Sequence, residues 1–175
     1  MTNRSDKQRD QDEQKLLFEL MRHAKENIDV IAKNCGFSRQ KTARMIKRLE
    51  ANKLVWGYTT IFDEQKIGLN HFVLLMKKTN KRYSEQTMNQ IISRSGFDIL
   101  ENLDDYIETS AYVHGEYDWM STFLAKDLHE AKKYVAALWG HYSEEIGKIT
   151  LLQTLMCVKK QFILNPEREK LKDIM

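Results

Sequence analysis

Apolar residues recur at helical spacing in three segments of the first third of the chain, residues 12–24, 28–35 and 39–52. Each segment therefore predicts a helix with one apolar stripe. Gly36 provides the turn between the second and third helices. Ser38 can cap the third helix, because its hydroxyl can accept a hydrogen bond from a backbone N–H of the first turn. Two short helices joined by a glycine turn predict a helix-turn-helix that docks on DNA.

The pattern changes after the third predicted helix. Residues 54–62 are rich in β-branched and aromatic residues, which predicts a strand that forms a wing. Residues 63–70 are polar and contain Gly68, so they are the candidate linker. Residues 1–11 are charged and predict a mobile arm.

The second half of the chain alternates strand-like and helix-like segments. The predicted strands are residues 71–78, 107–114, 119–125 and 148–162, and the predicted helices are residues 84–94 and 128–139. The first of these helices would turn Met88, Ile91 and Ile92 inward, and the second Leu128, Ala131, Val135 and Leu138. The order β-α-β-β-α-β is the ferredoxin-like arrangement, in which two helices cover one face of an antiparallel sheet. An identical sheet could cover the open face, which predicts a two-fold homodimer.

The fold class is therefore α+β, with two domains. An N-terminal winged helix-turn-helix domain takes residues 1–62, including the arm of residues 1–11, and is followed by the linker 63–70. The ferredoxin-like domain takes residues 71–165. The charged tail, residues 166–175, is expected to form a short exposed helix.

Positive charge is concentrated on the third predicted helix. The segment 38–56 carries six basic residues and one acid, a local net charge of +5 in a chain whose formal charge is +3. Such a surface neutralises phosphates and releases counterions. We expect base-edge contacts from Gln40, Lys41 and Arg44, and phosphate contacts from Ser38, Arg39, Lys47 and Arg48. The alternative is a solvated basic helix with no nucleic acid partner.

Composition narrows the class of protein. With 42% hydrophobic and 30% charged residues the chain predicts globular domains with cores. Its longest apolar runs, such as residues 72–76, are far shorter than the ~20 residues that span a bilayer, and the N-terminus lacks a secretory signal, so we expect a cytoplasmic protein. Cys35 and Cys157 are read as packing residues. We expect no structural metal, no cofactor and no catalytic residues.

Acidic residues cluster between the predicted helix 84–94 and the predicted strand 119–125 of the second domain. The segment 98–118 contains no Lys or Arg and seven acids, namely Asp98, Glu101, Asp104, Asp105, Glu108, Glu116 and Asp118. They could hold a cationic effector or a divalent ion. The alternative, which we favour, is a solvated loop whose like charges keep sheet edges apart. In the turn 115–118, Gly115 allows positive φ and Asp118 bonds its own backbone, which is sufficient for a hairpin.

Over nearly its full length the chain resembles the Lrp/AsnC family of prokaryotic transcription regulators. The residues that carry the resemblance are Asp12, Ile31-Ala32, Gly36-Phe37-Ser38, Ile46, Leu49-Glu50, Leu54-Val55-Trp56-Gly57-Tyr58, Ile67-Gly68 and Gly115-Glu116-Tyr117-Asp118. The resemblance implies a winged head that binds double-stranded DNA and a C-terminal sensing and oligomerisation domain. It also implies dimers, which in relatives can assemble into octamers, and a small effector such as an amino acid near Gly115, Tyr117 and Asp118.

Two residues of the third predicted helix depart from the family pattern. Thr42 stands where the family prefers an aliphatic residue, and Met45 stands where it usually has Arg, so the preferred DNA sequence is expected to be unusual. An architectural protein that coats DNA with little sequence preference remains an alternative. Siroheme decarboxylases share a similar scaffold, but their His-Asn-Tyr motif is not found here, which disfavours an enzyme.

Overall fold

The computed structural model of the chain describes residues 4–94 and 106–175, which fall into two compact units. The first unit contains the residues up to Ile61 together with the segment Cys157–Asp173, and the second contains Phe62–Met156. The segment 157–165, which the sequence analysis assigned to the second domain, thus groups with the first unit. Within the described ranges, every helix is too short or too polar to cross a bilayer.

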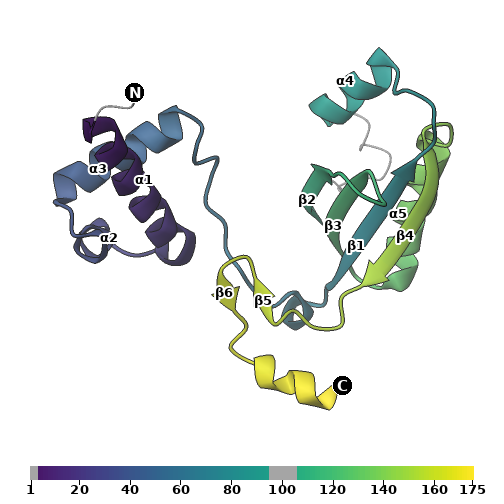
Figure 1. The fold of residues 1–175 in the computed structure, drawn as a ribbon. Coiled ribbons are helices and arrows are strands. Elements are labelled where there is room, and N and C mark those ends of the chain that lie inside the picture. Colours follow the sequence, from purple (N-terminus) through teal and green to yellow (C-terminus); the bar gives the residue numbers. More distant parts are fainter. Residues whose placement is uncertain (1–3, 95–105) are drawn as a thin grey trace. The chain divides into compact units, whose positions relative to one another are not determined.

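The head, residues 4–61, is built from three helices, α1 (Arg4–His23), α2 (Ile28–Cys35) and α3 (Arg39–Ala51) (Figure 1). The three predicted helices are confirmed. α2 ends at Gly36, which has φ +67° and lies in the left-handed region that glycine adopts at low cost. The core of the head consists of Leu16, Leu20, Ile31, Cys35, Met45 and Leu49.

Two predictions about the head are wrong. α1 begins at Arg4, so residues 4–11 are helical and do not form an arm. These residues are polar and show no apolar stripe, and their contacts include an exposed hydrogen bond from Gln8 to Asp12. Residues 54–62 form no strand. A strand needs a partner for its backbone groups, and the described part of the head offers none.

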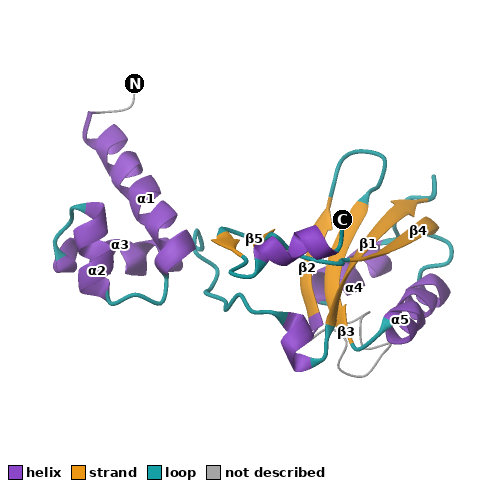
Figure 2. Ribbon diagram, turned by 90° about the horizontal axis from the view of Figure 1, so that it is seen from below, coloured by secondary structure: helices purple, strands orange, loops and turns teal. Residues whose placement is uncertain are grey.

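The second unit contains a four-stranded antiparallel sheet of order β2-β3-β1-β4. Its strands are β1 (Asn70–Lys78), β2 (Ile107–Tyr112), β3 (Trp119–Ala125) and β4 (Ile146–Gln153), and its helices are α4 (Glu85–Ser93) and α5 (Leu128–His141). Figure 2 shows the strands as one sheet with α5 beside it. The element order and strand order confirm the ferredoxin-like arrangement.

The inner face of the sheet packs on α5. Phe72 and Leu74 of β1 and Phe123 of β3 are fully buried, and the Phe123 ring meets the ring of Tyr134 edge to face at 4.8 Å between centroids. The expected inward residues are only partly confirmed: Ala131 and Leu138 are buried and Val135 packs against the core, whereas Leu128 is exposed. Tyr134 takes a core position that the sequence analysis missed.

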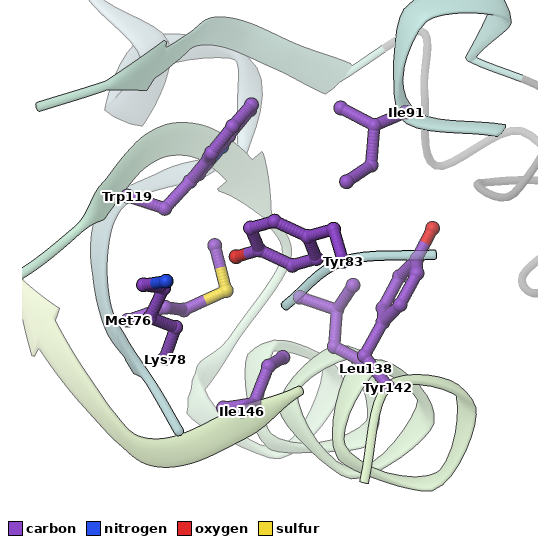
Figure 3. A pocket seen from close by; sticks show the side chains of 8 residues that line it. All are labelled: Met76, Lys78, Tyr83, Ile91, Trp119, Leu138, Tyr142 and Ile146. Atoms are coloured by element: carbon purple, nitrogen blue, oxygen red, sulfur yellow. The ribbon is translucent and has the colours of Figure 1, made fainter. Parts of the chain in front are cut away.

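α4 is short and contacts the core through one side. Of its three expected inward residues, Ile91 lines a small cavity with Leu138 and Tyr142 of the α5 region (Figure 3). Met88 is 41% exposed and Ile92 is 74% exposed, so their prediction as inward residues is wrong.

The segments around the sheet differ from the sequence-based boundaries. The linker contains a 3-10 turn, η1 (Glu64–Ile67), capped by Asp63. The predicted strand 148–162 is wrong beyond Gln153, where β4 ends and residues 154–158 are no longer in a strand. The chain then forms a separate short hairpin of β5 (Lys159–Lys160) and β6 (Ile163–Leu164), which turns at Gln161 with φ +50°. The tail contains the exposed 3-10 helix η4 (Arg168–Asp173).

Candidate nucleic-acid interface

The start of α3 is held by Ser38, whose hydroxyl accepts a hydrogen bond from the Lys41 backbone N–H at 3.2 Å. One side of α3 faces the core through Thr42, Met45 and Leu49. The hydroxyl of the fully buried Thr42 donates to the Ser38 carbonyl at 3.1 Å, so its polar group is satisfied. The predicted cap is therefore present. The helical repeat predicts Thr42, Ala43, Ile46 and Leu49 on the inward side; Thr42 and Leu49 are buried, whereas Ala43 and Ile46 are only partly buried. Met45, which was not expected there, takes a buried position.

Three of the predicted DNA contacts lie on the exposed side of α3. Gln40, Arg44 and Lys47 follow at spacings of four and three residues, so they share one side of the helix. Among the residues that the structure describes, these three side chains form no hydrogen bond or ion pair. Arg39 is also exposed, and its guanidinium lies 2.8 Å from the Asp29 carboxylate. Both side chains of that pair are more than half exposed, so its contribution is small and it can exchange for another anion.

Lys41 and Arg48 point instead toward α1. The Lys41 ammonium lies 2.5 Å from the Asp12 carboxylate and 4.1 Å from the centroid of the Phe37 ring. Arg48 donates a hydrogen bond to the carboxylate of Glu13. The hydrogen bond from Lys41 holds the pKa of Asp12 below its ordinary value. The basic surface that the sequence predicts is therefore narrower than expected, because two of its cations are matched by acids of α1.

Sequence reasoning missed these two acids. Asp12 and Glu13 are 29 and 35 residues away from the cations that they contact. No local spacing rule links residues so far apart. The available signal was the pair of adjacent acids on a helix predicted to pack against a strongly cationic one.

The comparisons with known proteins bear on the fold. No protein-family model matches the chain, and the search of curated proteins found no match. Among solved structures, the chain is similar to an AsnC family transcriptional regulator from Agrobacterium tumefaciens, with a TM-score of 0.64, 15% identity, and coverage of 89% of this chain and 96% of that one. The chain has the Lrp/AsnC fold.

Two further similar structures are described as complexes with L-methionine. A feast or famine regulatory protein from M. tuberculosis has a TM-score of 0.67 and 13% identity, over 86% of this chain and 95% of that one. A transcriptional regulator from Neisseria meningitidis has a TM-score of 0.65 and 14% identity, over 86% of this chain and 92% of that one. The structures from A. tumefaciens and N. meningitidis are of transcriptional regulators and the one from M. tuberculosis is of a regulatory protein; none of the three is of an enzyme.

The turn that the Lrp/AsnC resemblance singled out lies between β2 and β3. The Asp118 carboxylate accepts a hydrogen bond from the Lys78 N–H at 2.9 Å, and the Asp118 N–H donates to the Met76 carbonyl at 2.9 Å. Asp118 therefore joins the turn to β1. Among the described residues its carboxylate bonds the Lys78 N–H rather than the backbone of its own turn, which differs from the bond expected from sequence. Gly115 has open space around its Cα, with no heavy atom near the position of a Cβ.

Tyr117 extends in the direction of β4. Its hydroxyl lies 3.2 Å from the Thr150 hydroxyl, and the Lys148 ammonium lies 5.3 Å from the centroid of its ring. The hydrogen bonds with Thr150 and then Lys148 lower the pKa of the Tyr117 hydroxyl. Gly115, Tyr117 and Asp118 thus share a turn, but Tyr117 and Asp118 contact different strands.

Only part of the acidic segment can be placed. Asp98, Glu101, Asp104 and Asp105 lie outside the described residues. Glu108 lies 3.0 Å from the His71 imidazole, and Glu116 lies 3.9 Å from the Lys148 ammonium. In the two described ranges, no three His, Cys, Asp or Glu side chains are grouped so that they could hold a metal ion. The described acids are thus engaged with separate partners.

The two cysteines have different surroundings. Cys35 is buried in the head core, and burial raises the pKa of its thiol. Cys157 is half-buried, and its thiol lies 3.4 Å from the Lys159 carbonyl. Both are free thiols, and Cys35 has the packing role that its position on the apolar stripe predicts.

Proposed function

We propose that the protein is a transcription regulator that binds duplex DNA by inserting α3 into the major groove. The observation that carries the proposal is the row of Gln40, Arg44 and Lys47, which is exposed and without a partner among the described residues. Gln and Arg side chains near the start of such a helix can read base edges by paired hydrogen bonds.

The remaining candidates take phosphate roles. Ser38 and Arg39 lie at the start of α3, where backbone N–H groups and the helix dipole also favour a phosphate. Lys47 is exposed on the same side as Arg44 and serves as a further phosphate contact. We assign base edges to Gln40 and Arg44. Lys41 and Arg48 contribute to DNA binding only to the extent that they leave Asp12 and Glu13.

The test is a double substitution of Arg44 and Lys47 by Ala in the full chain. Affinity is measured by fluorescence anisotropy over a series of salt concentrations, on a duplex recovered by genome-wide mapping of bound sites. Loss of two phosphate or base contacts should weaken binding and reduce the slope of log affinity against log salt by up to roughly 1.8. Unchanged affinity and slope would exclude this docking mode.

The matched control replaces Lys132 and Lys133 by Ala. These two residues are exposed on α5 in the second unit, so the control removes the same charge without touching α3. It should bind like the unaltered protein apart from the effect of net charge. Comparing the mapped duplex with a random duplex also separates a specific regulator from an architectural protein, which would bind both alike.

We further propose that the protein acts as a homodimer joined through the open face of the sheet. The apolar side chains on that face are Val73, Leu75, Met120 and Leu152, of which Leu152 is 48% exposed. An identical face would cover them and would give two DNA-binding heads, which suits a palindromic site. Substituting Leu75 by Lys should give a monomer in light scattering, whereas the same substitution at the exposed Ile92 should leave the mass unchanged.

We propose that a small effector, such as an amino acid, binds near Gly115, Tyr117 and Asp118. Two structurally similar regulators are described as complexes with L-methionine, which supports an amino-acid ligand. Isothermal titration with L-methionine and a panel of other amino acids tests this. Replacing Tyr117 by Phe should weaken any measured binding, because it removes the hydroxyl next to Thr150.

A further inference from the structure

The N-terminal half of α1 and the cationic side of α3 enclose a groove of about 430 Å³ within the head. Three residues of α1 and four of α3 line it, namely Gln8, Arg9, Asp12, Lys41, Arg44, Met45 and Arg48. Residues 4–11 were expected to be an arm, but as a helix they supply one wall of this groove. The proposed docking of α3 in the major groove assigns no role to the α1 residues of the groove.

The walls of the groove carry an excess of positive charge. Four cations line it, Arg9, Lys41, Arg44 and Arg48, and Asp12 is the one acid in that lining. Lys41 is paired with Asp12 and Arg48 with Glu13, so the unmatched charge comes mainly from Arg44 and from the weakly paired Arg9. Arg44 has no partner among the described residues, and Arg9 makes only an exposed contact of 3.7 Å with Asp6. The Nε donor of Arg48 is shielded from solvent and, within the described ranges, has no hydrogen-bond acceptor. A groove with these properties is complementary to an anion.

We propose that the α1–α3 groove binds a backbone phosphate of the DNA that α3 reads. The inference rests on the proposed function, and it is supported by Arg44, which belongs both to the exposed row on α3 and to the groove. Arg9 is a phosphate contact supplied by α1. Asp12 is the competing anion, because it holds Lys41 in the place of a phosphate.

This arrangement gives Asp12 and Arg9 opposite effects on affinity. The Asp12 carboxylate neutralises Lys41 and repels an incoming phosphate, so its removal should strengthen binding. Arg9 attracts the phosphate, so its removal should weaken binding. A head that binds DNA through α3 alone would show neither effect beyond that of net charge.

The experiment compares four full-length variants with the unaltered protein. Arg9→Gln and Asp12→Asn alter the groove, and Lys7→Gln and Asp10→Asn are their matched controls. The control residues are exposed on the same turns of α1, carry the same charges and do not line the groove. Binding is measured by fluorescence anisotropy on a short duplex of random sequence, because phosphate contacts do not depend on base sequence. Circular dichroism checks that each variant keeps its helices.

The expected results are specific to the groove. Arg9→Gln should lower affinity about eightfold at roughly 0.1 M salt and reduce the salt slope by about 0.9, the effect of one phosphate contact. Asp12→Asn should raise affinity and steepen the slope. Lys7→Gln and Asp10→Asn should produce clearly smaller changes. If Arg9→Gln matches Lys7→Gln and Asp12→Asn matches Asp10→Asn, the proposal is overturned.

Two further outcomes separate the possible failures. If the Arg44 and Lys47 substitutions abolish binding while the groove variants match their controls, the proposed function stands and this inference fails. If the unaltered protein does not bind duplex DNA, both fail. Titration with inorganic tripolyphosphate tests a free anion as the occupant: tight binding that is lost in Arg9→Gln, without an effect of Arg9→Gln on DNA, would overturn the assignment to a DNA phosphate.

Discussion

Replacing Leu49 by Ala should unfold the head while the sheet unit stays folded. Leu49 is 2% exposed and belongs to the small core that α1, α2 and α3 share. Truncating such a side chain costs about 2–5 kcal/mol, because apolar contacts are lost and a cavity remains. A unit of about sixty residues has a free energy of unfolding of about 3–9 kcal/mol. The loss is therefore comparable to the whole stability of the head.

The assay uses two signals that report on different units. Far-ultraviolet circular dichroism during a urea titration follows all helices, including α1, α2 and α3. Tryptophan emission follows mainly the sheet unit, because Trp119 and Trp139 lie there and Trp56 in the head is 94% exposed in the folded state. In Leu49→Ala, part of the helical signal should be lost at much lower urea than the change in tryptophan emission. DNA binding should be lost with it.

The control is Leu54→Ala, which makes the same chemical change just beyond α3. Leu54 is 57% exposed, so its truncation leaves no cavity, and surface changes of this kind usually alter stability by less than about 0.5 kcal/mol. Equal unfolding curves for the two variants would refute the assignment of Leu49 to the head core. A Leu49→Ala transition in which both signals shift together would refute the independence of the two units.

Three further predictions test local features. Gly36→Ala should destabilise the head by about 1–2 kcal/mol, measured by urea titration, because Gly36 has φ +67° and alanine is strained there; an unchanged midpoint would contradict the turn geometry. Lys41 lowers the pKa of Asp12, so the Asp12–Lys41 pair should stabilise the head above the ordinary Asp pKa of 3.8, and this contribution should disappear as the pH falls through the lowered value. Urea titrations over pH should show that Asp12→Asn lacks this component and that Asp10→Asn keeps it. Tyr142→Phe should be neutral or slightly stabilising by thermal denaturation, since the Tyr142 hydroxyl is buried without a hydrogen-bond partner among the described residues and its burial raises the pKa; a marked loss of stability would reveal a partner for it.

Local chemistry allowed much of the fold to be predicted from sequence. The helices α2 and α3, the turn at Gly36 and the cap at Ser38 depend on residues within a few positions of one another, so their pattern is visible in the chain. The order of strands and helices in the second unit followed from apolar periodicity in the same way. The exposed side of α3 was predicted because helical geometry places Gln40, Arg44 and Lys47 opposite Thr42 and Leu49.

Long-range contacts account for what could not be predicted. The polar first half of α1 lacks the apolar stripe that marks a helix. Its Asp12 and Glu13 contact α3 residues that lie 29 and 35 positions later in the chain. Residues 54–62 have strand-like composition, but a strand also requires a partner, which composition does not supply. Likewise, Tyr134 is buried because its ring meets Phe123 of β3.

The sequence by itself determined that α3 carries cations on one side and apolar residues on the other, since that depends only on the helical repeat. The tertiary structure alone decided which of those cations keep their charge unmatched. Asp12 and Glu13 are brought to Lys41 and Arg48 by the packing of α1 against α3, while Arg44 keeps its charge unmatched within the described residues. Charge matching depends on distances of a few ångströms between distant segments, and only the packed helices set those distances.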